Sequence, residues 1–233
     1  MEYLHNEYFL MTLTFGSYFL ARRLQAWTRW TWLNPILVSI AVLIIFLRVA
    51  GIDYEVYHQA GQKIDFWLRP AVVALGLPLY RQLKAIRRQL LPILLSQLAG
   101  CLTGIVSVVL IAQGLGASRE VTLSLVPKSV TTPIAMEVTN TLGGIPSLTA
   151  AIVVLVGILG AVVGFKVMTI GHVRKPDSQG IGIGTAAHAV GTSAAIAHGE
   201  IEGVFSSLGL ILNGILTAVL ASTVVSWLLP QVG

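Results

Sequence analysis

The chain contains four apolar runs that are each close to the length of a membrane-crossing helix, and this feature most constrains its fold. The runs are Leu33 to Val49, Leu90 to Ala112, Leu148 to Met168 and Val204 to Leu229. A helix needs about 20 mostly apolar residues to cross a bilayer. Two shorter runs are weaker candidates, Tyr8 to Ala21 and Phe66 to Tyr80. We therefore expect an all-α polytopic membrane protein with about six spanning helices, forming a single integral membrane domain over residues 1–233.

The composition supports this expectation. Of the 233 residues, 55% are hydrophobic and 11% are charged, and the mean hydropathy is +0.81. So few polar residues cannot cover the surface of a soluble domain of this size, and we expect the lipid bilayer as its surroundings. The formal net charge is +5, but the basic residues form short clusters between apolar runs, which argues against a nucleic-acid partner.

The basic clusters predict how the chain is oriented. They follow three of the apolar runs and contain Arg22, Arg23 and Arg29, then Arg81, Lys84, Arg87 and Arg88, then Lys166, Arg174 and Lys175. The positive-inside rule places such clusters in the cytoplasm. This order predicts that Val121 to Leu142 enters the membrane from outside and returns there.

Two polar stretches, Val121 to Leu142 and Gly180 to Ala197, interrupt the apolar pattern. Irregular backbone is tolerated at membrane depth only where it is buried in protein or lines a cavity. Shifting the sequence on itself by 56 or 57 residues aligns the two stretches and the apolar runs after them. The sequence thus favours an inverted repeat with units 121–170 and 180–230, each a re-entrant or broken segment followed by one span. Whether the two stretches are re-entrant or cross fully stays open.

The first polar stretch carries candidate anion-binding residues. Pro127 and Pro133 can begin helices, whose N-termini attract anions. Beside them, Lys128 supplies a positive charge, and Ser129, Thr131 and Thr132 supply hydroxyl groups. Such a set suits a small carboxylate substrate. The alternative is that Lys128 extends to the membrane interface and the hydroxyls bond to their own helix.

Two ionisable residues are candidates for proton coupling. Glu137 lies on one helical face with Asn140, a further substrate-binding candidate, and an ionisable group at membrane depth is often functional. Its alternative role is a structural salt bridge or an interface carboxylate. His188 lies in the second polar stretch, where it could transfer a proton or serve as a packed hydrogen-bonding residue. Thr185, Gly191 and Thr192 flank it.

Other motifs point to packing. The small-residue ladders Gly157–Gly160–Gly164 and Gly209–Asn213–Thr217 are expected to let helices approach closely. The sequence has one cysteine and lacks hydrolase elbows, zinc-protease motifs and phosphate-binding loops, so we expect no enzyme activity, no cofactor and no metal site.

The sequence resembles the LrgB/CidB family of bacterial membrane proteins, also called antiholin-like proteins. The resemblance covers nearly the whole chain and rests on PKSVTTPIAMEV (127–138), LGGIPSLTA (142–150), GIGTAAHAVGT (182–192) and EGVFSSLGLILNGILTA (202–218). It implies a multi-pass protein of the bacterial inner (cytoplasmic) membrane that works with a small LrgA/CidA-type membrane partner, and it adds Thr185, Gly191 and Thr192 to the candidate substrate site. We also expect homo-oligomers. The family motif points to the same candidate residues in both polar stretches, apart from Asn140.

The resemblance also implies two functions. A plastid relative carries glycolate and glycerate, and bacterial relatives are linked to pyruvate. The first implied function is therefore secondary transport of a small monocarboxylate (glycolate, glycerate, pyruvate or lactate) by alternating access, with the proton as the candidate coupling ion. The second is a holin-like or antiholin-like regulator of membrane permeability and murein hydrolase activity. The chain departs from the family pattern at Ala187, Ala194 and Thr139–Asn140–Thr141, which puts substrate choice in doubt.

Overall fold

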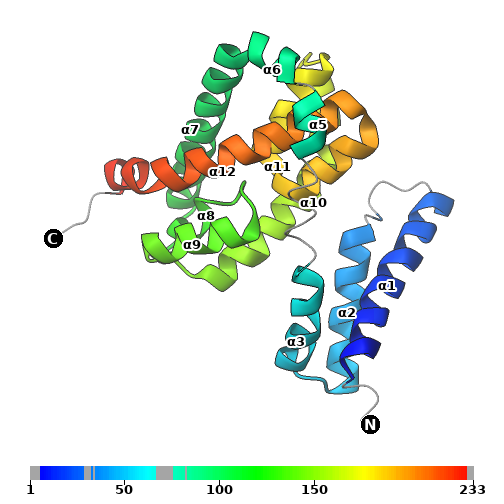
Figure 1. Ribbon diagram of the computed structural model, residues 1–233. Coiled ribbons are helices and arrows are strands. Elements are labelled where there is room, and N and C mark those ends of the chain that lie inside the picture. Colours follow the sequence, from blue (N-terminus) through cyan, green and yellow to red (C-terminus); the bar gives the residue numbers. More distant parts are fainter. Residues whose placement is uncertain (1–5, 29–32, 34, 67–75, 82, 230–233) are drawn as a thin grey trace. The chain divides into compact units, whose positions relative to one another are not determined.

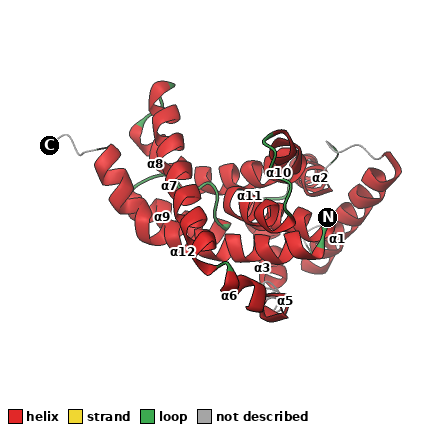
Figure 2. Ribbon diagram, turned by 90° about the horizontal axis from the view of Figure 1, so that it is seen from above, coloured by secondary structure: helices red, strands yellow, loops and turns green. Residues whose placement is uncertain are grey.

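The computed structural model describes residues 6–28, 33, 35–66, 76–81 and 83–229, and these residues form helices and connecting turns without a β-strand (Figures 1 and 2). The all-α expectation is confirmed. The chain divides into two compact units, 1–77 and 78–233. The expectation of a single membrane domain stays a prediction.

The first unit contains α1 (Glu7–Thr28), α2 (Pro35–Ala50) and α3 (Tyr54–Asp65). α2 ends at Gly51, whose φ of 64° is readily adopted by glycine. Leu10, Ile52 and Ala60 form a small buried core, and Lys63 pairs with Glu7. The sequence analysis did not predict α3. Its apolar residues Val56, Tyr57 and Ala60 recur at helical spacing, and they pack on this core.

The second unit contains most of the long apolar helices. Its elements are α5 (Gly76–Arg81, which begins in the first unit), α6 (Leu83–Arg88), α7 (Leu90–Gly114), α8 (Arg119–Leu125), α9 (Thr132–Leu142), α10 (Pro146–Ile170), α11 (Pro176–His198) and α12 (Glu200–Leu228). Among the described residues, α7, α10 and α12 are long and apolar enough to cross a membrane. They correspond to three of the four strong apolar runs.

The remaining predicted spans are short helices or lie largely outside the described residues. The run Leu33 to Val49 forms α2, an apolar helix of 16 residues, which is about 24 Å long and so shorter than a typical bilayer core. The run Tyr8 to Ala21 lies within α1. Most of the run Phe66 to Tyr80 lies outside the described residues. The expected number of six spans therefore stays a prediction.

Both polar stretches are broken helices, as expected. In the first, residues 126–131 interrupt the chain between α8 and α9. In the second, α11 is continuous except at Ala187 and His188, whose backbone angles are not helical. The φ of His188 is 41°, a conformation that side chains other than glycine rarely adopt. The structure thus puts a break inside each candidate repeat unit.

The element boundaries follow the spacing of the proposed repeat. α8 begins at Arg119 and α11 at Pro176, 57 residues later. α9 ends at Leu142 and α11 at His198, 56 residues later. A long apolar helix follows each broken segment. The repeat and its inversion across a membrane both remain predictions.

α11 packs between α10 and α12 because glycines allow close approach. A Cβ atom at Gly160 on α10 would lie 2.1 Å from Cβ of Ala187, and one at Gly157 would lie 2.4 Å from Nε2 of His188. On the other side, a Cβ at Gly184 would lie 2.0 Å from the carbonyl oxygen of Ser206 on α12. The ladder Gly157–Gly160–Gly164 therefore serves helix packing, as predicted.

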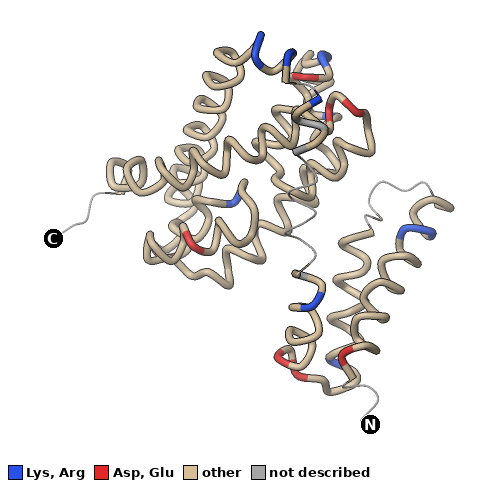
Figure 3. Tube along the Cα trace, in the orientation of Figure 1, with Lys and Arg blue, Asp and Glu red and all other residues tan. Residues whose placement is uncertain are grey.

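The N-terminal ends of α7, α11 and α12 lie together. Ile86 and Ile93 pack with Phe205 and Ile181 at this end. Figure 3 shows basic residues gathered there, near α6 and the α10–α11 connection. Two of the predicted cytoplasmic clusters belong to α5–α6 and to the α10–α11 connection, so the fold places both clusters at one end of the second unit. The positive-inside rule requires such a common side.

Candidate functional site

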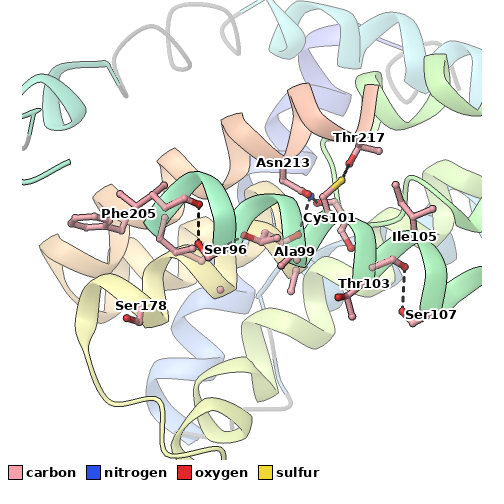
Figure 4. Close-up of a pocket in the computed structure, with 18 of the residues that line it drawn as sticks. Ser96, Ala99, Cys101, Thr103, Ile105, Ser107, Ser178, Phe205, Asn213 and Thr217 are labelled. Atoms are coloured by element: carbon pink, nitrogen blue, oxygen red, sulfur yellow. Dashed lines mark hydrogen bonds between the residues drawn. The ribbon is translucent and has the colours of Figure 1, made fainter. Parts of the chain in front are cut away.

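A cavity of about 720 Å³ lies within the second unit. Its walls are α7, the 126–131 break, the first half of α11 and α12 (Figure 4). Its described lining includes polar residues from all four segments, among them Ser96, Thr103, Ser107, Lys128, Ser129, Asp177, Thr185, Asn213 and Thr217. Four separate segments thus converge on one polar space in a largely apolar unit.

The cavity extends along α7 from Pro92 to Ser107, which is about 22 Å at 1.5 Å per residue. One end reaches Asp177 and Ser178 at the start of α11, at the basic end of the unit. The other reaches Lys128 and Thr217. The cavity therefore joins the basic end of the unit to the first helix break.

Lys128 is positioned by the turn that breaks the first polar stretch. Its backbone N–H donates to the carbonyl of Leu125 at 3.2 Å, and Pro127 before it is fully buried. Its half-buried side chain reaches α7, where Nζ donates to the carbonyl oxygen of Gly104 at 3.2 Å. Lys128 and Asp177 are the charged groups in the described lining. An ammonium has three donors, so Lys128 retains the capacity to bind an anion.

Asn213 connects the two broken segments. Its Nδ2 donates to the carbonyl oxygen of Ser129 at 3.2 Å and to that of Thr185 at 3.0 Å. Ser129 belongs to the first break, and Thr185 precedes the second by two residues. One buried amide on α12 therefore satisfies backbone carbonyls of both segments, which such groups require at membrane depth.

Thr185 also contacts α7. Nε2 of Gln97 donates to Oγ1 of Thr185 at 2.7 Å, and Gln97 is fully buried. Gly100 allows this approach, since a Cβ there would lie 3.0 Å from Cγ2 of Thr185. Thr185 is thus held by side chains from two helices.

The structure brings three of the predicted site residues to the cavity: Lys128, Ser129 and Thr185. The others lie elsewhere. Thr131 and Thr132 are half-buried at the start of α9, and Glu137 and Asn140 are exposed on α9. Gly191 and Thr192 are buried in the second half of α11, where Thr192 bonds to Ser206 at 2.9 Å.

His188 faces α10 and does not line the cavity. Its Nε2 lies 2.6 Å from the carbonyl oxygen of Val153, and its side chain is buried. Its own carbonyl oxygen accepts from Oγ1 of Thr192 at 2.9 Å. These contacts match the alternative role of a packed hydrogen-bonding residue.

Several polar residues in or beside the cavity were not among the predicted site residues. Gln97, Ser96 and Asp177 were not considered, and Asn213 and Thr217 were assigned to helix packing. Thr217 lies 3.5 Å from Sγ of Cys101. Gln97 and Asn213 could have been predicted from the sequence, because each is an amide side chain inside an apolar run. Polar side chains in such runs usually face the protein interior.

Known proteins resemble the chain over most of its length. The uncharacterized protein YxaC of Bacillus subtilis (strain 168) is 34% identical over 219 residues, covering 94% of this chain and 95% of that protein. The uncharacterized protein YwbG of the same strain is 36% identical, covering 84% and 87%. The antiholin-like protein LrgB of Bacillus mycoides (strain KBAB4) is 30% identical, covering 86% and 85%. No solved structure matches. The LrgB-like family matches residues 14–227, and the chain belongs to this family of membrane proteins.

Proposed function

We propose that this protein carries small monocarboxylates across the bacterial cytoplasmic membrane by alternating access. The observation that carries the proposal is Lys128, a half-buried cation on the wall of a cavity of about 720 Å³. That volume accommodates glycolate, glycerate, pyruvate or lactate with room for water. A lysine that only positioned the chain at an interface would not need to line such a cavity.

In this proposal, the carboxylate of the substrate binds the ammonium of Lys128. Ser129 and Thr185 supply neighbouring hydroxyl groups. Two broken segments that meet at a substrate site are typical of secondary transporters, in which one repeat rocks against the other. Asn213 then holds the two segments together in the conformation seen here.

The second candidate is an antiholin-like regulator of membrane permeability, favoured by the name of the Bacillus mycoides relative. Such a protein would act as an oligomer or through a small LrgA-type membrane partner. It has no need of a charged internal cavity, whereas a carboxylate carrier requires one.

Uptake into proteoliposomes distinguishes the candidates. The purified protein is reconstituted with a trapped dye, and uptake of labelled glycolate, glycerate, pyruvate and lactate is measured with and without an LrgA-type partner. A carrier gives saturable uptake with mutual competition and retained dye. Loss of dye without saturation would instead favour permeability control.

A further inference from the structure

Two buried side-chain oxygens of the second unit have no hydrogen-bond partner among the described residues. They are Oε1 of Gln97 and Oδ1 of Asn213. Their side chains are 0% and 2% exposed. An unpaired buried acceptor costs about 1–3 kcal/mol. Asn213 lines the cavity, and Gln97 bonds to Thr185, which also lines it. Two such oxygens on neighbouring helices call for a polar partner.

The surrounding hydrogen bonds identify both atoms as oxygens. Oγ1 of Thr185 donates to the carbonyl of Ile181 at 2.7 Å, so it must accept from Gln97, which places the nitrogen of Gln97 there. The nitrogen of Asn213 faces two carbonyl oxygens, which can only accept. Exchanging oxygen and nitrogen in Asn213 would break both of its bonds, and exchanging them in Gln97 would require the Thr185 hydroxyl to give up its bond to Ile181.

Both amides meet at Thr185. Gln97 bonds to its hydroxyl and Asn213 to its carbonyl. A Cβ at Gly209, one turn before Asn213 on α12, would lie 3.1 Å from Nε2 of Gln97. The two unpaired oxygens therefore belong to one region between α7, α11 and α12, beside the second helix break.

The chemistry of this region suits a monovalent cation. Its free groups are two neutral amide oxygens, and the hydroxyl oxygen of Thr185 keeps a second lone pair. Oxygen ligands beside a broken helix bind Na⁺ in many transporters. A divalent ion is usually held with carboxylates, and no acidic side chain among the described residues is bonded to Gln97, Thr185 or Asn213. We propose that Gln97, Asn213 and Thr185 form a binding site for Na⁺.

The side chain of Lys128 is directed to a part of α7 beyond Gln97, although its backbone adjoins Ser129, which Asn213 contacts. Its ammonium bonds to Gly104, which is seven residues beyond Gln97 on α7, or about 10 Å along the helix axis. If the proposed function holds, a substrate carboxylate would sit between the two positive charges, and each ion would strengthen binding of the other. The ion site itself does not depend on transport.

Ion binding is tested on the purified full chain without substrate. Thermal unfolding midpoints are compared in sodium, potassium and choline chloride at equal concentration. A cation at about ten times its Kd should raise the midpoint by roughly 3–6 °C in sodium relative to choline. Gln97→Leu should abolish this shift, and Gln113→Leu, the same change at an exposed position of α7 outside the cavity lining, should retain it.

A second variant covers the case in which Gln97→Leu does not fold. Gln97→Glu keeps an oxygen at the site and adds a negative charge, so Ca²⁺ should then stabilise the protein more than it stabilises the wild type. Equal midpoints in all three salts, or a sodium shift that persists in Gln97→Leu, would overturn the proposal. Sodium binding without carboxylate uptake would leave the site standing and reject only the transport function.

Discussion

The side-chain amide of Asn213 donates to the backbone carbonyl oxygen of Ser129 at 3.2 Å, across 84 residues of sequence. The same amide reaches Thr185 at 3.0 Å. Because one side chain satisfies carbonyls in both broken segments, it determines how the two segments meet at the cavity.

Replacing Asn213 with leucine should destabilise the second unit. The change leaves the carbonyl oxygens of Ser129 and Thr185 without this donor, at about 1–3 kcal/mol for each group. The unfolding midpoint in detergent should fall by several degrees. Ile215→Ala is the control, since Ile215 lies nearby on α12 and is exposed. Equal midpoints for Asn213→Leu and wild type would show that the amide does not hold the segments.

Lys128→Met should weaken substrate binding while the protein still folds. A hydrogen bond to a charged group contributes about 1.5–3 kcal/mol, so the apparent affinity for the carboxylate should fall about 10- to 100-fold. Competition against labelled substrate in proteoliposomes measures this change. Lys166→Met removes an exposed charge from α10 and is the control. Unchanged affinity in Lys128→Met would remove Lys128 from the proposed site.

Gly184→Ala should disrupt the contact between α11 and α12. The added Cβ would lie 2.0 Å from the backbone oxygen of Ser206, and backbone cannot move aside as a flexible side chain can. Overpacking of this kind costs about 1–3 kcal/mol. Thermal unfolding measures the loss, with Gly114→Ala as the control because a Cβ there meets nothing within 4 Å. A midpoint for Gly184→Ala as high as that of the control would contradict the close packing.

His188→Gln should retain uptake and its response to an imposed pH gradient. Glutamine can still donate to the carbonyl of Val153, which is the contact that His188 makes at 2.6 Å. Glutamine does not titrate, so this variant would lose the response to the pH gradient if His188 transferred protons. The measurement is carboxylate uptake by His188→Gln and wild-type proteoliposomes, with and without an imposed pH gradient. Loss of the gradient response with normal folding would assign proton coupling to His188 after all.

The amino-acid sequence determined the features that depend on local composition. Long apolar runs produced α7, α10 and α12 because a helix satisfies its own backbone in lipid. Polar and small residues at 126–131 and near His188 indicated both breaks. The repeat inferred from the spacing of 56 or 57 residues remains a prediction. Lys128, Ser129 and Thr185, which the sequence analysis proposed, line the cavity, and their role in substrate binding remains a prediction.

The tertiary structure decided which of these residues share a cavity. Glu137 and His188, like Lys128, are ionisable residues in the two polar stretches. Glu137 is nevertheless exposed on α9, and His188 faces α10. Gln97 and Asn213 look like isolated polar residues in apolar helices, and they meet at Thr185 only because α7 and α12 both pack on α11. The rotation of each helix about its axis, set by glycine contacts such as that of Gly184 with Ser206, determines which side chains face the cavity. Contacts between distant segments fix that rotation, so a local pattern cannot reveal it.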